Sequence, residues 1–124
     1  MNNEINLLTE AVIGAAIEVH KELGPGLLES AYQRALAYEL GQRGIPFEQQ
    51  KLCPVQYKDL IVDDAYRLDF LVKGLGVELK AVDALLAVHD AQVLTYLRFT
   101  GCHIGLLMNF RSTSLTKGLR RLAL

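Results

Sequence analysis

The sequence predicts a mixed α/β domain in which helices cover the faces of a sheet. Residues 5–43 carry only helical periodicity, the chain after Pro46 carries strand patterns, and a further helical stretch interrupts these strands. Helices packed on a mixed sheet bury the apolar side of every such element. With 124 residues, 51% of them hydrophobic, the chain has the size and composition of one globular unit. We therefore expect a single domain over residues 1–124.

Three helices are expected. Apolar residues recur every three or four positions from Ile5 to Leu23, and Gly24-Pro25-Gly26 ends this first helix. A second helix is expected from about Leu27 to Arg43 and a third from about Ala84 to Thr100, because a glycine follows each of them. The residues of the second helix expected to face the core are Leu28, Ala31, Tyr32, Ala35, Leu36 and Leu40.

The strands are predicted from β-rich runs and from the turn residues between them. Pro46 and Pro54 favour an edge position for the first strand, because proline cannot donate to a sheet. Lys73-Gly74 suits a tight hairpin turn between two richly apolar strands. The expected elements are an edge strand at 47–57, a short piece at 60–62 before a turn at Asp63-Asp64, hairpin strands at 66–72 and 75–82, a buried strand at 102–110, and a tail at 115–124 that is either an edge strand or a helix.

Composition excludes several classes of protein. No apolar run is long enough to cross a bilayer, and an acidic residue stands where a secretory signal carries positive charge. We therefore expect a cytoplasmic protein with no membrane partner. Cys53 and Cys102 lack the CxxC spacing of zinc or redox sites, so we interpret them as small core side chains.

The net charge of −1 does not indicate a nucleic-acid-binding protein, but the charge is unevenly distributed. No Asp or Glu follows Asp90, whereas five basic residues do. They form either a cationic rim suited to a phosphate backbone or an ordinary solvated face. The residues assigned to such a rim are Arg98, Arg111 and Lys117.

Three charged residues stand out in the predicted hairpin. Glu78 and Lys80 are two apart in a strand and so point to the same face, and the hairpin can bring Asp69 opposite Glu78. Two carboxylates in apolar surroundings repel each other, and a hard divalent cation between them removes the conflict. The alternative is a surface salt bridge that joins Glu78 or Asp69 to Lys80 or Arg67 on a half-exposed sheet.

These residues resemble the D-x(n)-E-x-K core of the PD-(D/E)XK nuclease superfamily. Gly26, Glu29 and Tyr32 resemble the signature of the small GxxExxY proteins, and Gln92 with Tyr96 resembles the QxxxY of the exonuclease and recombination-type branch. The resemblance extends from Val19 to Phe110, with Leu68 where the superfamily name has proline. It implies a restriction-endonuclease-like core and hydrolysis of nucleic-acid phosphodiester bonds with Mg²⁺ or Mn²⁺.

The resemblance also implies roles for individual residues. Asp69, Glu78 and the main-chain carbonyl of Leu79 would hold the metal, and Lys80 would assist the attacking water. Glu29 resembles the additional acid that acts on the metal through water. Gln92 and Tyr96 resemble residues that position the acids or the phosphate.

Other interpretations stay open at this point. Glu29 also suits the positive end of a helix dipole, and both Tyr32 and Tyr96 suit packing. His89 shares a helical face with Gln92 and Tyr96, and His20 is either a helix cap or an accessory residue. The whole chain is either a nuclease or a non-catalytic module of the same fold that binds nucleic acid or a protein partner, with a homodimer as one option.

Overall fold

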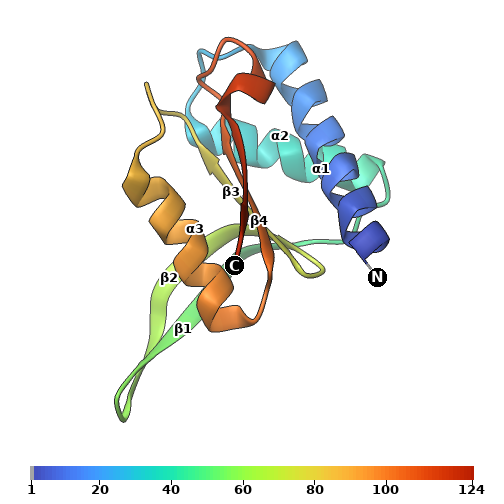
Figure 1. Ribbon diagram of the computed structural model, residues 1–124. Helices are drawn as coiled ribbons and strands as arrows, with labels where there is room; N and C mark the ends of the chain where they lie inside the picture. The colour runs from blue at the N-terminus through green and yellow to red at the C-terminus, as the bar shows by residue number, and fades with distance from the viewer. Residues whose placement is uncertain (1) are drawn as a thin grey trace.

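The computed structural model describes residues 2–124 and contains a five-stranded sheet with the strand order β1-β2-β3-β4-β5. The parallel pair is β3 and β4, joined through a crossover helix, and the other neighbours are antiparallel. The predicted mixed α/β class is confirmed (Figure 1). The elements are α1 (Asn2–Leu23), α2 (Glu29–Gln42), β1 (Glu48–Tyr57), β2 (Leu60–Val72), β3 (Leu75–Lys80), α3 (Ala87–Thr100), β4 (Ile104–Asn109), the 3-10 helix η1 (Leu115–Gly118) and β5 (Leu119–Ala123).

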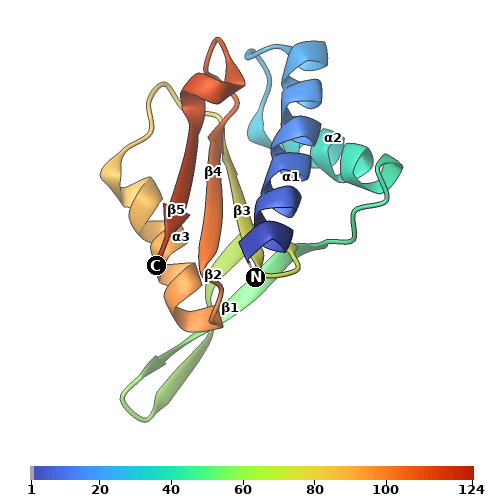
Figure 2. The ribbon, with the colours of Figure 1, turned by 45° about the vertical axis from the view of Figure 1, so that its right-hand side comes forward.

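The core has two parts, one on each face of the sheet. Helices α1 and α2 cover one face, where Val77 and Leu79 of β3 pack against residues such as Ala16 and Leu36. Helix α3 covers the other face and packs against Leu68 and Leu107, among others (Figure 2). The central strand β3 is therefore buried on both sides, and its polar residues need partners within the protein.

The ends of the predicted helices agree with the structure to within a few residues, and Gly101 closes α3 with a φ of 79°. One residue of the second helix was assigned wrongly. Leu28 precedes α2, in extended conformation, and its side chain is 75% exposed. It lies one residue outside the helix, so the apolar stripe does not include it.

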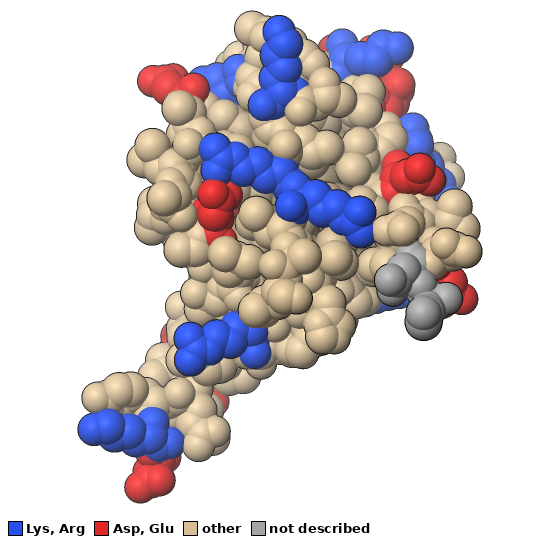
Figure 3. Space-filling view, viewed as in Figure 1, with Lys and Arg blue, Asp and Glu red and all other residues tan. Residues whose placement is uncertain are grey.

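The expected turn at Asp63-Asp64 is wrong. Strand β2 runs without a break from Leu60 to Val72 and pairs with β1 along its length, with an irregularity between Cys53 and Val55. The distal half of this β1–β2 ribbon projects from the body of the molecule (Figure 3). Both faces of the ribbon are exposed to solvent there, so Asp63 and Asp64 can lie within a strand. From the sequence alone, the same pair is typical of a turn.

The predicted strand end at Val82 is also wrong, because β3 stops at Lys80. The side chain of the buried residue Asn109 satisfies the hydrogen-bonding groups of the Val82 backbone. Val82 N donates to Asn109 Oδ1 at 3.1 Å, and Asn109 Nδ2 donates to Val82 O at 2.8 Å. This side-chain bridge leads the chain away from the sheet toward α3. The tail forms η1 and then β5, so the edge-strand alternative holds.

Within residues 2–124, no helix is long and apolar enough to cross a membrane. Cys53 is buried and Cys102 is partly buried, and both are free thiols.

Candidate functional site

The site lies where β2 and β3 separate. Their paired register ends at Phe70 and Val77, and the next residues on the two strands are Asp69 and Glu78. Asp69 Oδ2 accepts a hydrogen bond from Leu79 N at 2.8 Å, and Asp69 N donates to Glu78 Oε1 at 3.3 Å. Each carboxylate is therefore held by the backbone of the opposite strand. The sequence predicted that these acids meet, and the structure brings them together.

Both acidic residues are almost completely buried, each with 5% of its surface exposed. Burial raises the pKa of Glu78 to about 7, and the negative charge of Asp69 adds to this rise. Burial also raises the pKa of Asp69, against the opposing effect of the Leu79 hydrogen bond. Lys80 Nζ lies 3.4 Å from Glu78 Oε2 and is the one cation paired with either acid in the described chain. One ammonium group does not neutralise two carboxylates, so further positive charge would be favourable here.

Helix α2 joins this cluster through two side chains on successive turns. Gln33 Nε2 donates to Glu29 Oε2 at 3.1 Å and to Asp69 Oδ1 at 3.0 Å. Burial and, to a smaller extent, the negative charge of Asp69 raise the pKa of Glu29. Gln33 thus connects Glu29 to the buried acids.

The hydroxyl of Tyr32 fixes the loop ahead of α2. It donates to Gly24 O at 2.5 Å and accepts from Leu27 N at 3.0 Å, while its ring stacks on Phe110 at a centroid distance of 4.7 Å. The spacing of Gly26, Glu29 and Tyr32 therefore has a structural explanation. Tyr32 anchors the turn from which Glu29 enters the site, and packing is its evident role.

Helix α3 approaches the site through Tyr96, whose ring centroid lies 6.2 Å from that of Tyr66. Burial and, to a smaller extent, the charge of Glu78 raise the pKa of Tyr66, so Tyr66 lies near this acid as well as near Tyr96. Among the described residues, Tyr66 Oη and Gln92 Oε1 are buried without a hydrogen-bond partner. His89 is used differently, because its Nδ1 accepts from Leu86 N at 2.8 Å and caps α3. The three residues expected on one helical face thus have different surroundings.

His20 has a structural position. Its Nε2–H donates to Ser112 O at 2.8 Å, and its ring lies 6.1 Å from the Phe110 ring. The histidine therefore ties the end of α1 to the loop after β4.

The three residues assigned to a cationic rim do not lie together. Arg111 and Lys117 follow β4, at the end of the sheet where β3 finishes with Lys80. Arg98 lies in the last turn of α3, next to the start of β4 and thus at the opposite end, where it packs on the Phe99 ring. On the face shown in Figure 3, basic side chains form separate groups with neutral surface between them.

The donors present fit a hard divalent cation. Asp69 and Glu78 supply carboxylate oxygens with lone pairs beyond those used in the hydrogen bonds, and magnesium prefers such ligands. In a β-strand the N–H and C=O of one residue point to the same side, so the Leu79 carbonyl faces the gap toward Asp69 as its N–H does. Within residues 2–124, no set of three or more His, Cys, Asp or Glu side chains is placed to hold a metal. A metal here would need the carbonyl or water as its further ligands.

These features define a class of protein. An α+β domain whose central strand carries Glu78 and Lys80, beside an aspartate on the adjacent antiparallel strand, has the architecture of a restriction-endonuclease-like fold. The sequence model of the PD-(D/E)XK nuclease superfamily matches residues 6–122, and the chain belongs to this superfamily. The narrower GxxExxY assignment is compatible with this match. No curated protein and no solved structure matches the chain.

The sequence did not reveal three residues of the site. Gln33, Gln50 and Tyr66 all lie beside the acids, and Gln50 Nε2 is 3.5 Å from Asp69 Oδ1. Gln33 follows Glu29 by four positions, a spacing that places both on one helical face and could have indicated it. No local pattern distinguishes Gln50, which reaches Asp69 from a backbone conformation with a φ of 51°.

Proposed function

We propose that this protein hydrolyses phosphodiester bonds of DNA or RNA with a divalent cation, Mg²⁺ or Mn²⁺, held by Asp69, Glu78 and the Leu79 carbonyl. One observation carries the proposal: two buried carboxylates share a gap between strands, each held by the other strand's backbone, with a single ammonium group beside them. Superfamily membership favours a nuclease-type function for this arrangement.

The metal would polarise the scissile phosphate and lower the pKa of a bound water. The protein's own residues prepare the site for this chemistry. The hydrogen bonds of Asp69 to Leu79 N and to Gln33 fix the orientation of its carboxylate before substrate arrives. Such preorganised polar groups are effective because they need not reorient during the reaction.

Lys80 would orient the attacking water and balance negative charge on the phosphate in the transition state. Its ammonium group lies 3.4 Å from Glu78 and keeps only 17% of its side chain exposed, which places a fixed positive charge at the site. With Glu78 holding a cation, this ammonium group would be free to interact with the substrate.

Glu29 would act on the metal through water, because Gln33 holds its carboxylate near Asp69. Tyr96 would position the acids indirectly, through its contact with Tyr66 beside Glu78. For Gln92 we propose a role in positioning a water, since its buried Oε1 can accept a hydrogen bond and has no partner among the described residues; a contact with the substrate phosphate would come from its Nε2–H donors. His89 and His20 have structural partners and are at most accessory.

The test compares cleavage of labelled single-stranded and double-stranded DNA and RNA with Mg²⁺ and Mn²⁺. We expect Asp69→Asn, Glu78→Gln and Lys80→Met each to lower the rate by roughly a hundredfold or more. Asp63→Asn, a matched change in an exposed carboxylate of β2, should cleave as the parent does. Cleavage that survives all three site substitutions, or that needs no divalent cation, would refute the proposal.

The second candidate is a non-catalytic module of the same fold that binds nucleic acid or a protein partner in the cytoplasm, alone or as a homodimer. The observation that favours it is the small donor set, since no group of three metal-binding side chains occurs in the described chain. Retained binding of an oligonucleotide with no turnover under any of these conditions would support the module over the enzyme.

A further inference from the structure

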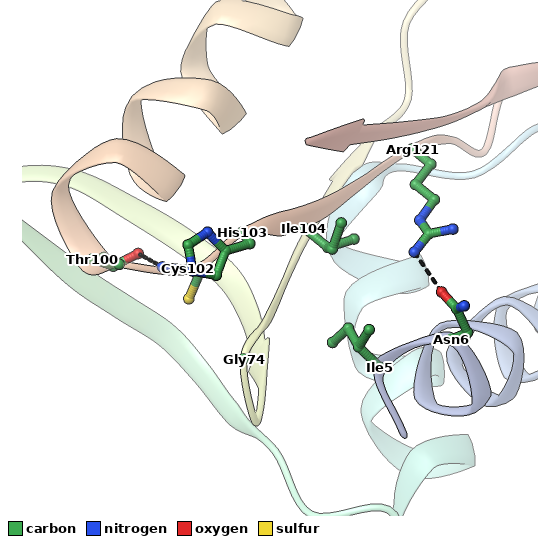
Figure 4. Close-up of a pocket in the computed structure, with 9 residues that line it drawn as sticks. Ile5, Asn6, Gly74, Thr100, Cys102, His103, Ile104 and Arg121 are labelled. Carbon is green, nitrogen blue, oxygen red and sulfur yellow. Dashed lines mark hydrogen bonds between the residues drawn. The ribbon is translucent and has the colours of Figure 1, made fainter. Parts of the chain in front are cut away.

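A second hollow lies at the other end of the sheet from the candidate metal site. It is bordered by the β2–β3 turn, the α3–β4 connection, the first turns of α1, and β5 (Figure 4). Its volume of about 810 Å³ is within the range of sites that bind small molecules. The residues that line it include Ile5, Asn6, Gly74, His103, Ile104 and Arg121.

The lining combines an apolar part with a charged one. Ile5 and Ile104 are partly buried and pack against the core, and their side chains approach the hollow from α1 and β4 (Figure 4). Arg121 extends across the space between β5 and α1, where its Nη2 donates to Asn6 Oδ1 at 2.7 Å. His103, exposed just before β4, also lines the hollow.

The charge of Arg121 is not neutralised by a neighbour. Its adjacent residue, Arg120, pairs with Asp90 Oδ2 at 2.6 Å, whereas Arg121 forms no ion pair with any acid in residues 2–124. An adjoining hollow shares Ile5 and Gly74 with this one and is lined by both Glu4 and Lys73, whose charges offset each other. The Arg121 guanidinium therefore keeps donors available for an anion, and it can bind carboxylate or phosphate in a bidentate manner.

We infer that this hollow binds a small organic anion, with its carboxylate or phosphate group on Arg121 and its apolar body against Ile5 and Ile104. The site is separate from the acids of the metal site. Those acids adjoin the end of β3, whereas Gly74 and Gly101 of the hollow precede β3 and β4. Anion binding at this hollow does not require nuclease activity at the metal site.

The test uses two probes of nearly identical shape. Benzoate and its neutral analogue benzamide are titrated into ¹⁵N-labelled protein, and the amide signals of Gly74, Gly101 and His103 are followed by NMR. We expect benzoate to bind roughly tenfold more tightly than benzamide, because hydrogen bonds to a charged carboxylate are stronger than those to a neutral amide. Phenyl phosphate in a parallel titration shows whether the phosphate group is preferred.

Variants at two adjacent arginines provide the control. Arg121→Gln should lose the preference for benzoate, Arg121→Lys should retain part of it, and Arg120→Gln should bind as the parent does. Asp69→Asn should also bind benzoate normally, which separates this site from the metal site. Equal binding of benzoate and benzamide, no shift with either anion, or full binding by Arg121→Gln would overturn the inference.

Discussion

Glu78 is an acid of the site whose pKa is strongly raised. Its carboxyl group has a pKa of about 7 because it is buried and because Asp69 lies beside it. Lys80 and the backbone N–H of Asp69 oppose this rise without cancelling it. Near neutral pH a substantial fraction of Glu78 is therefore protonated in the folded protein, whereas the proposed metal chemistry needs the ionised form.

The first prediction concerns the pH dependence of stability. The folded Glu78 binds its proton more tightly than the unfolded residue, whose pKa is 4.5. Its favourable contribution is therefore fully present below pH 4.5 and is lost as the pH rises through about 7, a change of about 3 kcal/mol. Asp69, whose pKa is also raised, contributes with the same sign.

Urea unfolding at several pH values, without divalent cations, measures this effect. Glu78→Gln should flatten the dependence of the unfolding free energy on pH between about pH 5 and 8. Glu48→Gln, at an exposed position of β1, should not. Added Mn²⁺ should stabilise the parent more at the upper pH limit than at the lower one, because the cation binds the ionised acids. A Glu78→Gln variant that keeps the full pH dependence would contradict the assignment.

The second prediction concerns Tyr32. Tyr32→Phe removes the hydroxyl that bonds both Gly24 O and Leu27 N, and it leaves the ring stack on Phe110 in place. We expect a loss of about 1–3 kcal/mol in the free energy of unfolding, since two backbone groups lose a buried partner. Denaturant unfolding measures it, and Tyr38→Phe, at a position 68% exposed, should change stability by less than about 0.5 kcal/mol. Equal effects at the two tyrosines would exclude the anchoring role.

At the scale of elements, close packing of α3 on the sheet depends on Gly105. A Cβ at Gly105 would lie 2.6 Å from Val93 Cγ1, whereas a Cβ at Gly76 would make an ordinary contact 3.5 Å from Tyr96 Cδ1. Gly105 faces α3 from β4, and its missing side chain lets the helix lie close to the strand. This contact holds Tyr96 against Tyr66 beside Glu78.

The third prediction follows from this packing. Gly105→Ala should force α3 away from β4 and lower the free energy of unfolding by about 1–3 kcal/mol. Gly41→Ala, inside α2 with no atom within 4 Å of the new Cβ, should instead stabilise the protein by up to about 1 kcal/mol. Thermal or urea unfolding of the pair gives the comparison. A neutral Gly105→Ala would mean that α3 is not tightly packed there.

The elements that the sequence predicts well are those whose pattern has a single physical cause. Lys73-Gly74 marks a tight turn, and the apolar runs on either side are buried, so the hairpin that aligns Asp69 with Glu78 is evident. The β1–β2 ribbon was misread because its distal half is solvated and obeys no burial pattern. Gln50 meets Asp69 through a tertiary contact that no local pattern encodes, whereas the spacing of Gln33 from Glu29 was a local signal that the sequence analysis did not use.

At the scale of the whole molecule, the basic residues are divided between the two ends of the sheet. Arg111 and Lys117 share the end at which β3 reaches Lys80, and Arg98 and Arg121 lie toward the other. With a net charge of −1, the molecule has no overall attraction for a polyanion. If it binds nucleic acid, the few basic residues near Lys80 must supply most of the phosphate contacts.

The fourth prediction tests this division through salt dependence, and it rests on the proposed nuclease function. The inactive variant Asp69→Asn should bind a labelled oligonucleotide with a slope of log K against log salt of only about −2 to −3, because few phosphates are contacted. Arg111→Gln should reduce the magnitude of this slope by about 1. The ion pair of Arg111 with Asp83 does not prevent this, since it is 3.4 Å long and Asp83 is 97% exposed.

Arg98→Gln is the matched control, since it removes the same charge from an exposed arginine at the opposite end of the sheet. Its slope and affinity should equal those of the Asp69→Asn background, measured by fluorescence anisotropy at several KCl concentrations. If instead Arg98→Gln and Arg111→Gln reduce the slope equally, the nucleic acid must extend along the α3 side of the molecule. The nucleic acid would then contact all the basic residues expected to form a cationic rim, although these residues lie toward opposite ends of the sheet.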